Sequence, residues 1–447
     1  MAMEKDMTRG TPWKLILSFF FPLLLGNCFQ QVYNLVDTII VGKGISDSAL
    51  AAVGSTGSLH FFIFGFLGGI TNGVSIPIAQ AYGAKDEPRL KRVVAQSAIT
   101  CLSLGLLISV LSVIFTVPLL KLLRTPSDIF RDARIYMQIF CAGLFVSTLY
   151  NYCSFLLRAI GDSKTPLWSI VISSLVNVVL DLLFVITFHW GVAGAAIATV
   201  IAQALSALFC LIRLRTAKIV HPARSDWRPD LRKILELIRL GLPVGFMNSV
   251  TALGGMLLQY FINSLGSVYT AAYAVCQRFF AFFEQPGVAI GLSVSTYVGQ
   301  NFGAKDLKRI RRGVVSACIM ALIVGLALGS LELFLPDQLA GLMLSDHDTI
   351  VLCRKFLPYG GAFLWILNFL FVYRNASLAM GFTVVPMLSG ILELALRVGF
   401  CLLLAPSHGF SGIVFAEMSA WVGAAVFLCV YYHFKAHQLS KDRSYLS

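Results

Sequence analysis

Residues 17–42 read LSFFFPLLLGNCFQQVYNLVDTIIVG, and this apolar run decides the class of fold. A helix of this length measures about 39 Å, which is enough to cross a hydrocarbon core of roughly 30 Å. Similar runs recur along the 447-residue chain, which is 57% hydrophobic and only 13% charged. A soluble chain would carry about 25% charged residues. The composition therefore predicts an all-α membrane protein with many spans.

Breaks at polar or Gly/Pro-rich stretches divide the chain into twelve predicted spans. They lie at residues 14–42, 49–82, 92–119, 134–158, 165–188, 192–214, 234–263, 268–302, 313–335, 354–380, 384–404 and 410–434. With the N-terminus inside, 25 Lys and Arg residues face the inside and seven face the outside. Because cytoplasmic loops carry the excess of Lys and Arg, we expect both termini to be cytoplasmic.

The net charge of +13 does not indicate a nucleic-acid partner, because the basic residues lie in loops where the positive-inside rule accounts for them. The ten cysteines lie mostly inside apolar runs and form no Cys-x-x-Cys pair. Such cysteines are typical of small buried packing residues rather than metal ligands or disulfides. We expect no metal centre and no cofactor.

The two halves of the chain repeat each other at an offset of 220 residues. Residues 79–86 read AQAYGAKD and residues 299–306 read GQNFGAKD. At the same offset, Gly161 and Pro166 match Gly381 and Pro386. We expect an N-terminal six-helix bundle at 1–216, a cytoplasmic linker at 217–230 and a C-terminal six-helix bundle at 231–447. Six spans per repeat make the repeats parallel, an arrangement typical of alternating-access transporters.

One polar stripe in the first span marks a candidate site. Spacings of three and four residues place on one helix face Asn27, Gln30, Asn34 and Asp37. A carboxylate in hydrocarbon is costly unless it faces a cavity or a partner, so Asp37 is a candidate functional residue. The alternative is that Asp37 caps or pairs near the membrane interface, close to Lys43.

The fifth span carries a second acid, Asp181, one helical turn after Asn177. The repeat places Leu257 or Leu258 opposite Asp37 and Cys401 opposite Asp181, so the aspartate pair belongs to the N-terminal half alone. Depth along the spans predicts a shared site, in the outer half of that bundle, for Tyr33, Asn34, Asp37, Asn177, Asp181 and Thr199. Two carboxylates in a low dielectric cannot both ionise cheaply, so we expect one to hold a proton. Na⁺ coordination is the alternative.

The C-terminal half has intramembrane charges of its own. Glu393 and Arg397 lie at i, i+4 and are interpreted as a structural ion pair, and Arg374 is expected to pair with Glu417 across helices. Substrate contact is the alternative for this group. Glu284 lies among aromatic residues in QRFFAFFEQP, which suits an organic cation. The candidate substrate contacts are Gln30, Gln203, Glu284 and Arg278.

Together these features resemble the multidrug and toxic compound extrusion (MATE) transporters over essentially the whole chain. The resemblance rests on the repeat and on VYNLVDTIIVGK at 32–43, RAIGDSKTP at 158–166, NVVLDLLFV at 177–185 and FVYRNASLAMG at 371–381. It implies a prokaryotic exporter in the cell membrane that exchanges cationic or amphipathic drugs for H⁺ or Na⁺.

The chain is more similar to the DinF-like branch than to the NorM-like branch of this family. The DinF-like branch implies protonation of the first-span aspartate, in a network that would here comprise Tyr33, Asp37, Asn177, Asp181 and Thr199. The NorM-like branch uses a glutamate in the seventh span, but residues 243–260, PVGFMNSVTALGGMLLQY, contain no acid.

Three other functions are weighed against drug antiport. A lipid-linked saccharide flippase shares this broad architecture, but its anionic cargo does not suit an acidic N-terminal site. An intramembrane enzyme would need a nucleophile or metal constellation, and none is evident, so we expect no enzyme. A receptor or scaffold leaves the repeat unexplained. The expected partners are a drug-like small molecule and the lipid bilayer, with the protein a monomer.

Overall fold

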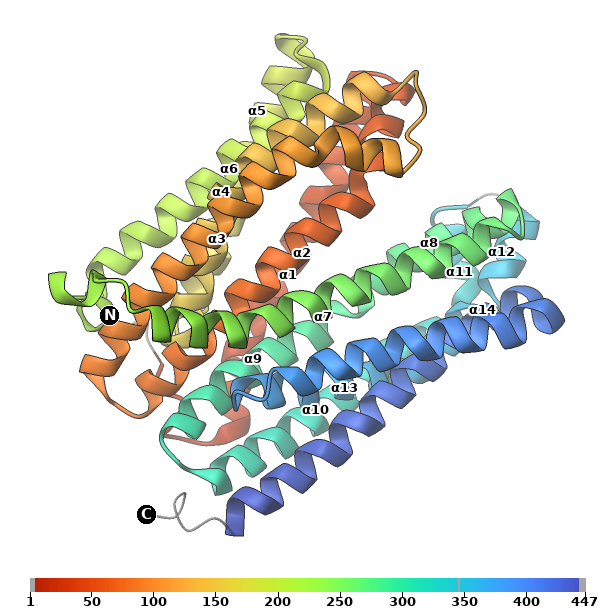
Figure 1. The fold of residues 1–447 in the computed structure, drawn as a ribbon. Coiled ribbons are helices and arrows are strands. Elements are labelled where there is room, and N and C mark those ends of the chain that lie inside the picture. Colours follow the sequence, from red (N-terminus) through yellow and green to blue (C-terminus); the bar gives the residue numbers. More distant parts are fainter. Residues whose placement is uncertain (1–4, 345, 442–447) are drawn as a thin grey trace. The chain divides into compact units, whose positions relative to one another are not determined.

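A computed structural model describes residues 5–344 and 346–441, and all regular structure in these residues is helical. Figure 1 colours the helices in chain order. The first half contains α1 (Pro12–Gly44), α2 (Asp47–Gly83), α3 (Glu87–Leu122), α4 (Phe130–Ala159), α5 (Lys164–Asp181), the π-helical segment η1 (Leu182–Thr187) and α6 (Gly191–Thr216). Two 3₁₀ turns, η2 (Lys218–Val220) and η3 (Arg224–Trp227), follow.

The second half repeats this order with several changes. Its helices are α7 (Leu231–Asn263), α8 (Ser267–Phe283), α9 (Gln285–Gly303), α10 (Leu307–Phe334), α11 (Pro336–Gly341), α12 (His347–Cys353), α13 (Leu357–Ala379) and α14 (Val384–Lys441). The helix that corresponds to α2 is divided into α8 and α9, and the short helices α11 and α12 follow α10. The helices that correspond to α5 and α6 both lie in α14, where the backbone breaks between them at Gly409.

The twelve predicted spans are all present as helices in the described residues. Ten helices are long and apolar enough to cross a membrane. One of them, α14, holds two predicted spans, which are separated at Gly409, where the backbone leaves helical geometry with φ of 54° and ψ of −129°. The predicted span 268–302 is divided between α8 and α9 at Glu284, just before Pro286.

The backbone confirms that the two halves are a structural repeat. Lys85 and Lys305, 220 residues apart, both adopt left-handed geometry, with φ of 57° and 58°. The aspartate after each lysine caps the next helix and accepts a hydrogen bond from a backbone N–H, at 3.1 Å in the first copy and 2.9 Å in the second. Gly161 and Gly381 have φ of 88° and 89°.

The helices group into two compact units whose ranges differ from the bundles expected at 1–216 and 231–447. The first unit comprises Leu25–Gly245 together with Lys5 and Asp6. The second comprises Met7–Leu24 and the described residues from Phe246 onward. The start of each repeat's first helix therefore packs with the other repeat.

Hydrogen bonds explain this exchange. The backbone N–H of Met7 donates to the Gln300 side chain at 2.8 Å, which holds the segment before α1 in the second unit. In the first unit, the Gln96 amide donates to the carbonyl oxygens of Asp226 and Arg228, each at 2.8 Å. Gln96 thereby fixes the segment before α7 to α3.

Small residues let helices approach closely within each unit. A Cβ atom on Gly329 of α10 would lie 2.1 Å from the carbonyl oxygen of Gly361 on α13. Such close contact between small residues is a usual source of helix association in lipid. In the first unit, α4 packs against α2, α3 and α6, and α6 packs against α5. These contacts position the polar residues of α4, α5 and α6.

Candidate functional site

The two predicted aspartates come together in the first unit. Asp181, the last residue of α5, is fully buried, and Asp37 of α1 is half-buried. Their carboxyl groups lie close enough to interact directly. Neither oxygen of Asp181 has a hydrogen-bond partner of standard geometry among the described residues, and one oxygen of Asp37 also lacks one. Adjacent carboxyl groups with three such unpaired oxygens are suited to hold a proton or a cation between them.

Asn177 extends the unpaired polar surface by one turn of α5. Its side chain is fully buried, and neither its amide nitrogen nor its amide oxygen has a partner in the described part of the chain. Directly after Asp181, the helix continues in π geometry over Leu182–Thr187. Single π-helical turns are frequent at functional sites, and this one begins at the predicted acid.

Two hydroxyl groups complete the cluster. The Tyr33 hydroxyl interacts with the Thr199 side chain and with both carboxylates. Thr199 also donates to the carbonyl oxygen of Ala195 at 3.0 Å, which orients it on α6. The structure thus brings predicted residues from α1, α5 and α6 into one place, while their functional roles stay predictions.

Tyr136 of α4 belongs to the same cluster, and sequence reasoning missed it. Its side chain is 7% exposed and interacts with Asp37, Tyr33 and Asp181. Depth along the helix was the signal that could have found this residue. Tyr136 lies about 9 Å from the start of α4, and Asp37 lies the same distance from the end of its span.

Three of the predicted polar residues make other contacts. Asn34 is exposed and accepts a hydrogen bond from the exposed Gln30 at 3.5 Å, so its side chain does not join the carboxylates. Gln203 accepts a hydrogen bond from the Ser147 hydroxyl inside the first unit. These contacts do not identify a substrate.

The charges of the second unit form a chain rather than two separate pairs. Arg397 donates to Glu393 at 2.9 Å, as predicted from their spacing. The prediction that Arg374 pairs with Glu417 is wrong, because Arg374 donates to the other oxygen of Glu393 at 2.9 Å. Glu417 instead lies 3.9 Å from Arg397. A single carboxylate with two oxygens can accept from both guanidinium groups at once, one oxygen for each, which explains the difference.

The remaining candidates of this unit differ in their surroundings. Glu284, at the junction of α8 and α9, lies within electrostatic range of Arg397, Glu393 and Glu417. Arg278 on α8 is exposed. Glu332 of α10 was not predicted, although it is fully buried and neither of its oxygens has a partner among the described residues. A single Glu in an apolar run gave no pattern to detect it.

No group of three or more His, Cys, Asp and Glu side chains that could hold a metal ion occurs in residues 5–344 and 346–441.

Comparison of the sequence with known proteins identifies its family. A family model described as MatE matches residues 22–183 and 243–403, once in each half of the chain. The chain belongs to the MATE family. The family predicted from the sequence motifs is therefore confirmed, and its members include bacterial proteins.

Two of these MATE relatives illustrate the similarity. The chain is 33% identical over 366 residues to "Probable multidrug resistance protein YoeA" of Bacillus subtilis (strain 168), covering 79% of this chain and 78% of that protein. It is 23% identical over 452 residues to "Multidrug export protein MepA" of Staphylococcus saprophyticus, covering 98% and 97% of the two chains.

Solved MATE structures share the fold. One in the bent conformation aligns with a TM-score of 0.90 at 23% identity, covering 99% of this chain and 98% of that chain. Another, in the straight conformation, aligns with a TM-score of 0.89 at 23% identity, covering 98% and 99%. These alignments confirm the predicted MATE-like, all-α architecture.

Proposed function

We propose that this MATE-family protein is a secondary active transporter that exports organic cationic or amphipathic compounds in exchange for H⁺ or Na⁺ by alternating access. The observation that carries the proposal is the Asp37–Asp181 pair, two adjacent acids for which the described protein supplies too few donors. A transporter needs such a site, because its coupling cation must bind and leave in every cycle.

Electrostatics explains how the pair would couple the two fluxes. Two unit charges about 4 Å apart repel by about 4 kcal/mol at an effective dielectric constant of 20. A proton or Na⁺ removes that repulsion, so the pair favours one bound cation. An occupied pair presents less negative charge to a cationic drug, so cation entry promotes drug release. Tyr33 and Thr199 would orient the Asp37 carboxylate, and Asn177 would supply a neutral oxygen ligand or an amide donor.

The names of the relatives support this substrate class. The Bacillus subtilis relative is named a probable multidrug resistance protein, and the staphylococcal relative is named a multidrug export protein. A lipid-linked saccharide flippase is not favoured, because its anionic cargo would be repelled by the acidic pair.

The protein is further proposed to be a monomer in a prokaryotic cell membrane, with both termini in the cytoplasm. The 25 to seven division of Lys and Arg between the two sides supports this orientation.

Inside-out membrane vesicles test the proposed exchange. An acidic or Na⁺-rich lumen should drive accumulation of an organic cation such as ethidium, and comparing the two gradients identifies the coupling ion. Absence of accumulation under both gradients, with the protein folded and present, would contradict antiport. Ethidium-independent movement of a fluorescent lipid-linked saccharide would favour the flippase.

A further inference from the structure

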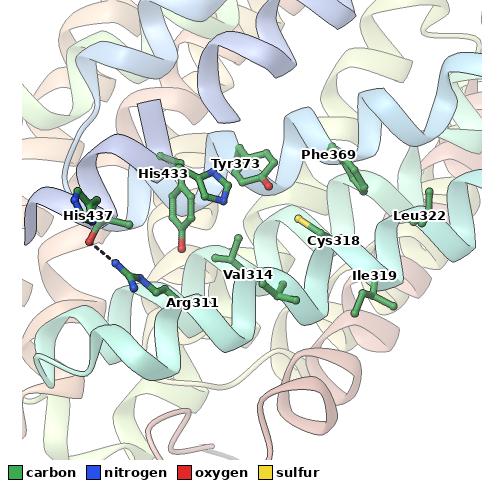
Figure 2. Close-up of a pocket in the computed structure, with 12 residues that line it drawn as sticks. Arg311, Val314, Cys318, Ile319, Leu322, Phe369, Tyr373, His433 and His437 are labelled. Carbon is green, nitrogen blue, oxygen red and sulfur yellow. Dashed lines mark hydrogen bonds between the residues drawn. The ribbon is translucent and has the colours of Figure 1, made fainter. Parts of the chain in front are cut away.

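A groove on the second unit lies apart from both polar clusters. Its volume is about 470 Å³, within the range of small-molecule sites. Figure 2 shows that residues of α10, α13 and the last part of α14 line it. One end of the groove is polar and the other is apolar, so its chemistry suits an amphiphile.

The polar end combines a cation with an unpaired hydroxyl group. Arg311 donates one hydrogen bond, to the carbonyl oxygen of Ala436 at 2.9 Å, and its other N–H groups have no acceptor among the described residues. The Tyr432 side chain is only 3% exposed, and its hydroxyl has no partner in the described part of the chain. His433 and His437 line the same end (Figure 2). These groups can donate to a phosphate.

The apolar end continues along α10 away from Arg311. Val315 and Ile319 are 59% and 54% exposed, and Leu322 lies further along the same face with Phe369 opposite on α13. The distance from Arg311 to Leu322 along the helix is about 16 Å. Since α10 is a membrane span, the exposed apolar side chains face lipid tails.

The length and polarity of the groove match a lipid at a membrane surface. In the proposed orientation, Arg311 and the end of α14 lie at the cytoplasmic leaflet, which carries the anionic lipids. Basic pockets between helices on that side bind anionic headgroups. Lys308 and Lys435, near Arg311 and His433 in the chain, add positive charge to this end.

We propose that this groove binds one anionic phospholipid of the cytoplasmic leaflet, with its phosphate at Arg311 and Tyr432 and an acyl chain along Ile319 and Phe369. The site goes beyond drug antiport. It rests on the proposed orientation but not on which drug or ion is transported, so a binding measurement separates the two proposals. A bound lipid would hold the end of α14 against α10.

Native mass spectrometry of the full-length, delipidated protein tests this site. Phosphatidylglycerol should form a single tight adduct, and phosphatidylcholine with the same acyl chains should bind more weakly. Arg311→Gln should weaken the phosphatidylglycerol adduct about fivefold, the effect of one basic residue at an anionic surface. Arg312→Gln is the matched control, because it removes the same charge from an exposed neighbour that does not line the groove.

A second variant tests the apolar end separately. Ile319→Trp fills the groove from the exposed surface and leaves Arg311 in place, so it should also weaken the phosphatidylglycerol adduct. Soluble glycerol phosphate should not displace the lipid, and displacement would show a plain anion site. Equal loss in Arg311→Gln and Arg312→Gln, or equal affinity for the two lipids, would overturn the proposal.

Discussion

Individual residues of the first unit carry an unusual concentration of unpaired polar atoms. Asn177 and Asp181, one turn apart on α5, are both fully buried, and none of their side-chain nitrogen and oxygen atoms has a partner of standard geometry among the described residues. Buried polar groups are normally paired, so each exception needs an explanation. A cation that enters and leaves the Asp37–Asp181 pair supplies one.

Tyr136→Phe should change the cation affinity of this site without unfolding the protein. The change keeps the buried ring and removes the hydroxyl group beside Asp37, and one such hydrogen bond is worth about 1 kcal/mol. The apparent affinity for Na⁺ should fall about fivefold because an oxygen ligand is lost, whereas that for H⁺ should rise because ionised Asp37 loses a donor. Gradient-driven ethidium uptake against cation concentration measures both. Tyr150→Phe, on the same helix but near Arg158, should leave both affinities unchanged. Equal effects in both variants would remove Tyr136 from the site.

Glu393→Gln should destabilise the second unit strongly. Glu393 accepts from Arg374 and Arg397, and removing one partner of a buried ion pair costs about 3–5 kcal/mol. Thermal unfolding should shift down clearly. Asp337→Asn breaks the exposed pair with Arg354 and serves as the control, with little change in Tm expected. An unchanged Tm in Glu393→Gln would show that the charge chain is not structural.

The sequence allowed part of the site to be predicted, and the limits have physical causes. Depth along straight helices placed Asp37 beside Asp181, because a span fixes position along one axis. It could not place Asn34, whose side-chain direction depends on rotation about α1, nor choose the partner of Arg374 among several carboxylates. Glu332 lies singly in an apolar run, so no spacing marked it, and only depth along α4 marked Tyr136.

Among the helices, hydropathy predicted the number of spans but not the interruption within one of them. The predicted span 268–302 is interrupted at Glu284, because Pro286 cannot supply the backbone N–H that a continuous helix would need. Gly409, by contrast, breaks the helical geometry of α14 at a positive φ, in the gap between the predicted spans 384–404 and 410–434. The exchange of the first helical segments between units was not predictable, since it depends on hydrogen bonds such as that from Met7 to Gln300.

Gly329→Ala should destabilise the contact between α10 and α13. The added Cβ would lie 2.1 Å from a backbone oxygen, and overpacking of this kind costs about 1–3 kcal/mol. Gly399→Ala, in α14, is the control, because no atom lies within 4 Å of its new Cβ and alanine favours the helix by about 1 kcal/mol. Thermal melts in detergent should separate the two, and a Tm rise in both would contradict close packing at Gly329.

For the whole molecule, two repeated units in one MATE-family chain carry different chemistry. The first holds the adjacent Asp37–Asp181 pair, three of whose four oxygens lack a partner among the described residues. In the second, Glu393 and Glu417 lie against Arg374 and Arg397, while Glu332 stands apart from this chain of charges. We infer that the first unit couples to the cation and that the charge chain of the second is structural. This asymmetry follows from substitutions within the repeat, because leucine and cysteine stand in the second half where the first half has Asp37 and Asp181.

The proposed orientation predicts the behaviour of fusions to the C-terminus. A green fluorescent protein fused there should fluoresce, and alkaline phosphatase fused there should be inactive, because the excess of Lys and Arg places that end inside. A phosphatase fusion after Lys121, in a predicted outer loop, is the positive control. The reverse pattern would overturn the orientation.

Transport by Asp37→Asn in proteoliposomes tests the central claim most directly. The variant should still exchange ethidium down its own gradient but lose accumulation driven by H⁺ or Na⁺, while Asp128→Asn, an exposed acid in the same half, should behave as the wild type. Gradient-driven accumulation by Asp37→Asn at the wild-type rate would contradict the assignment of the pair as the coupling site.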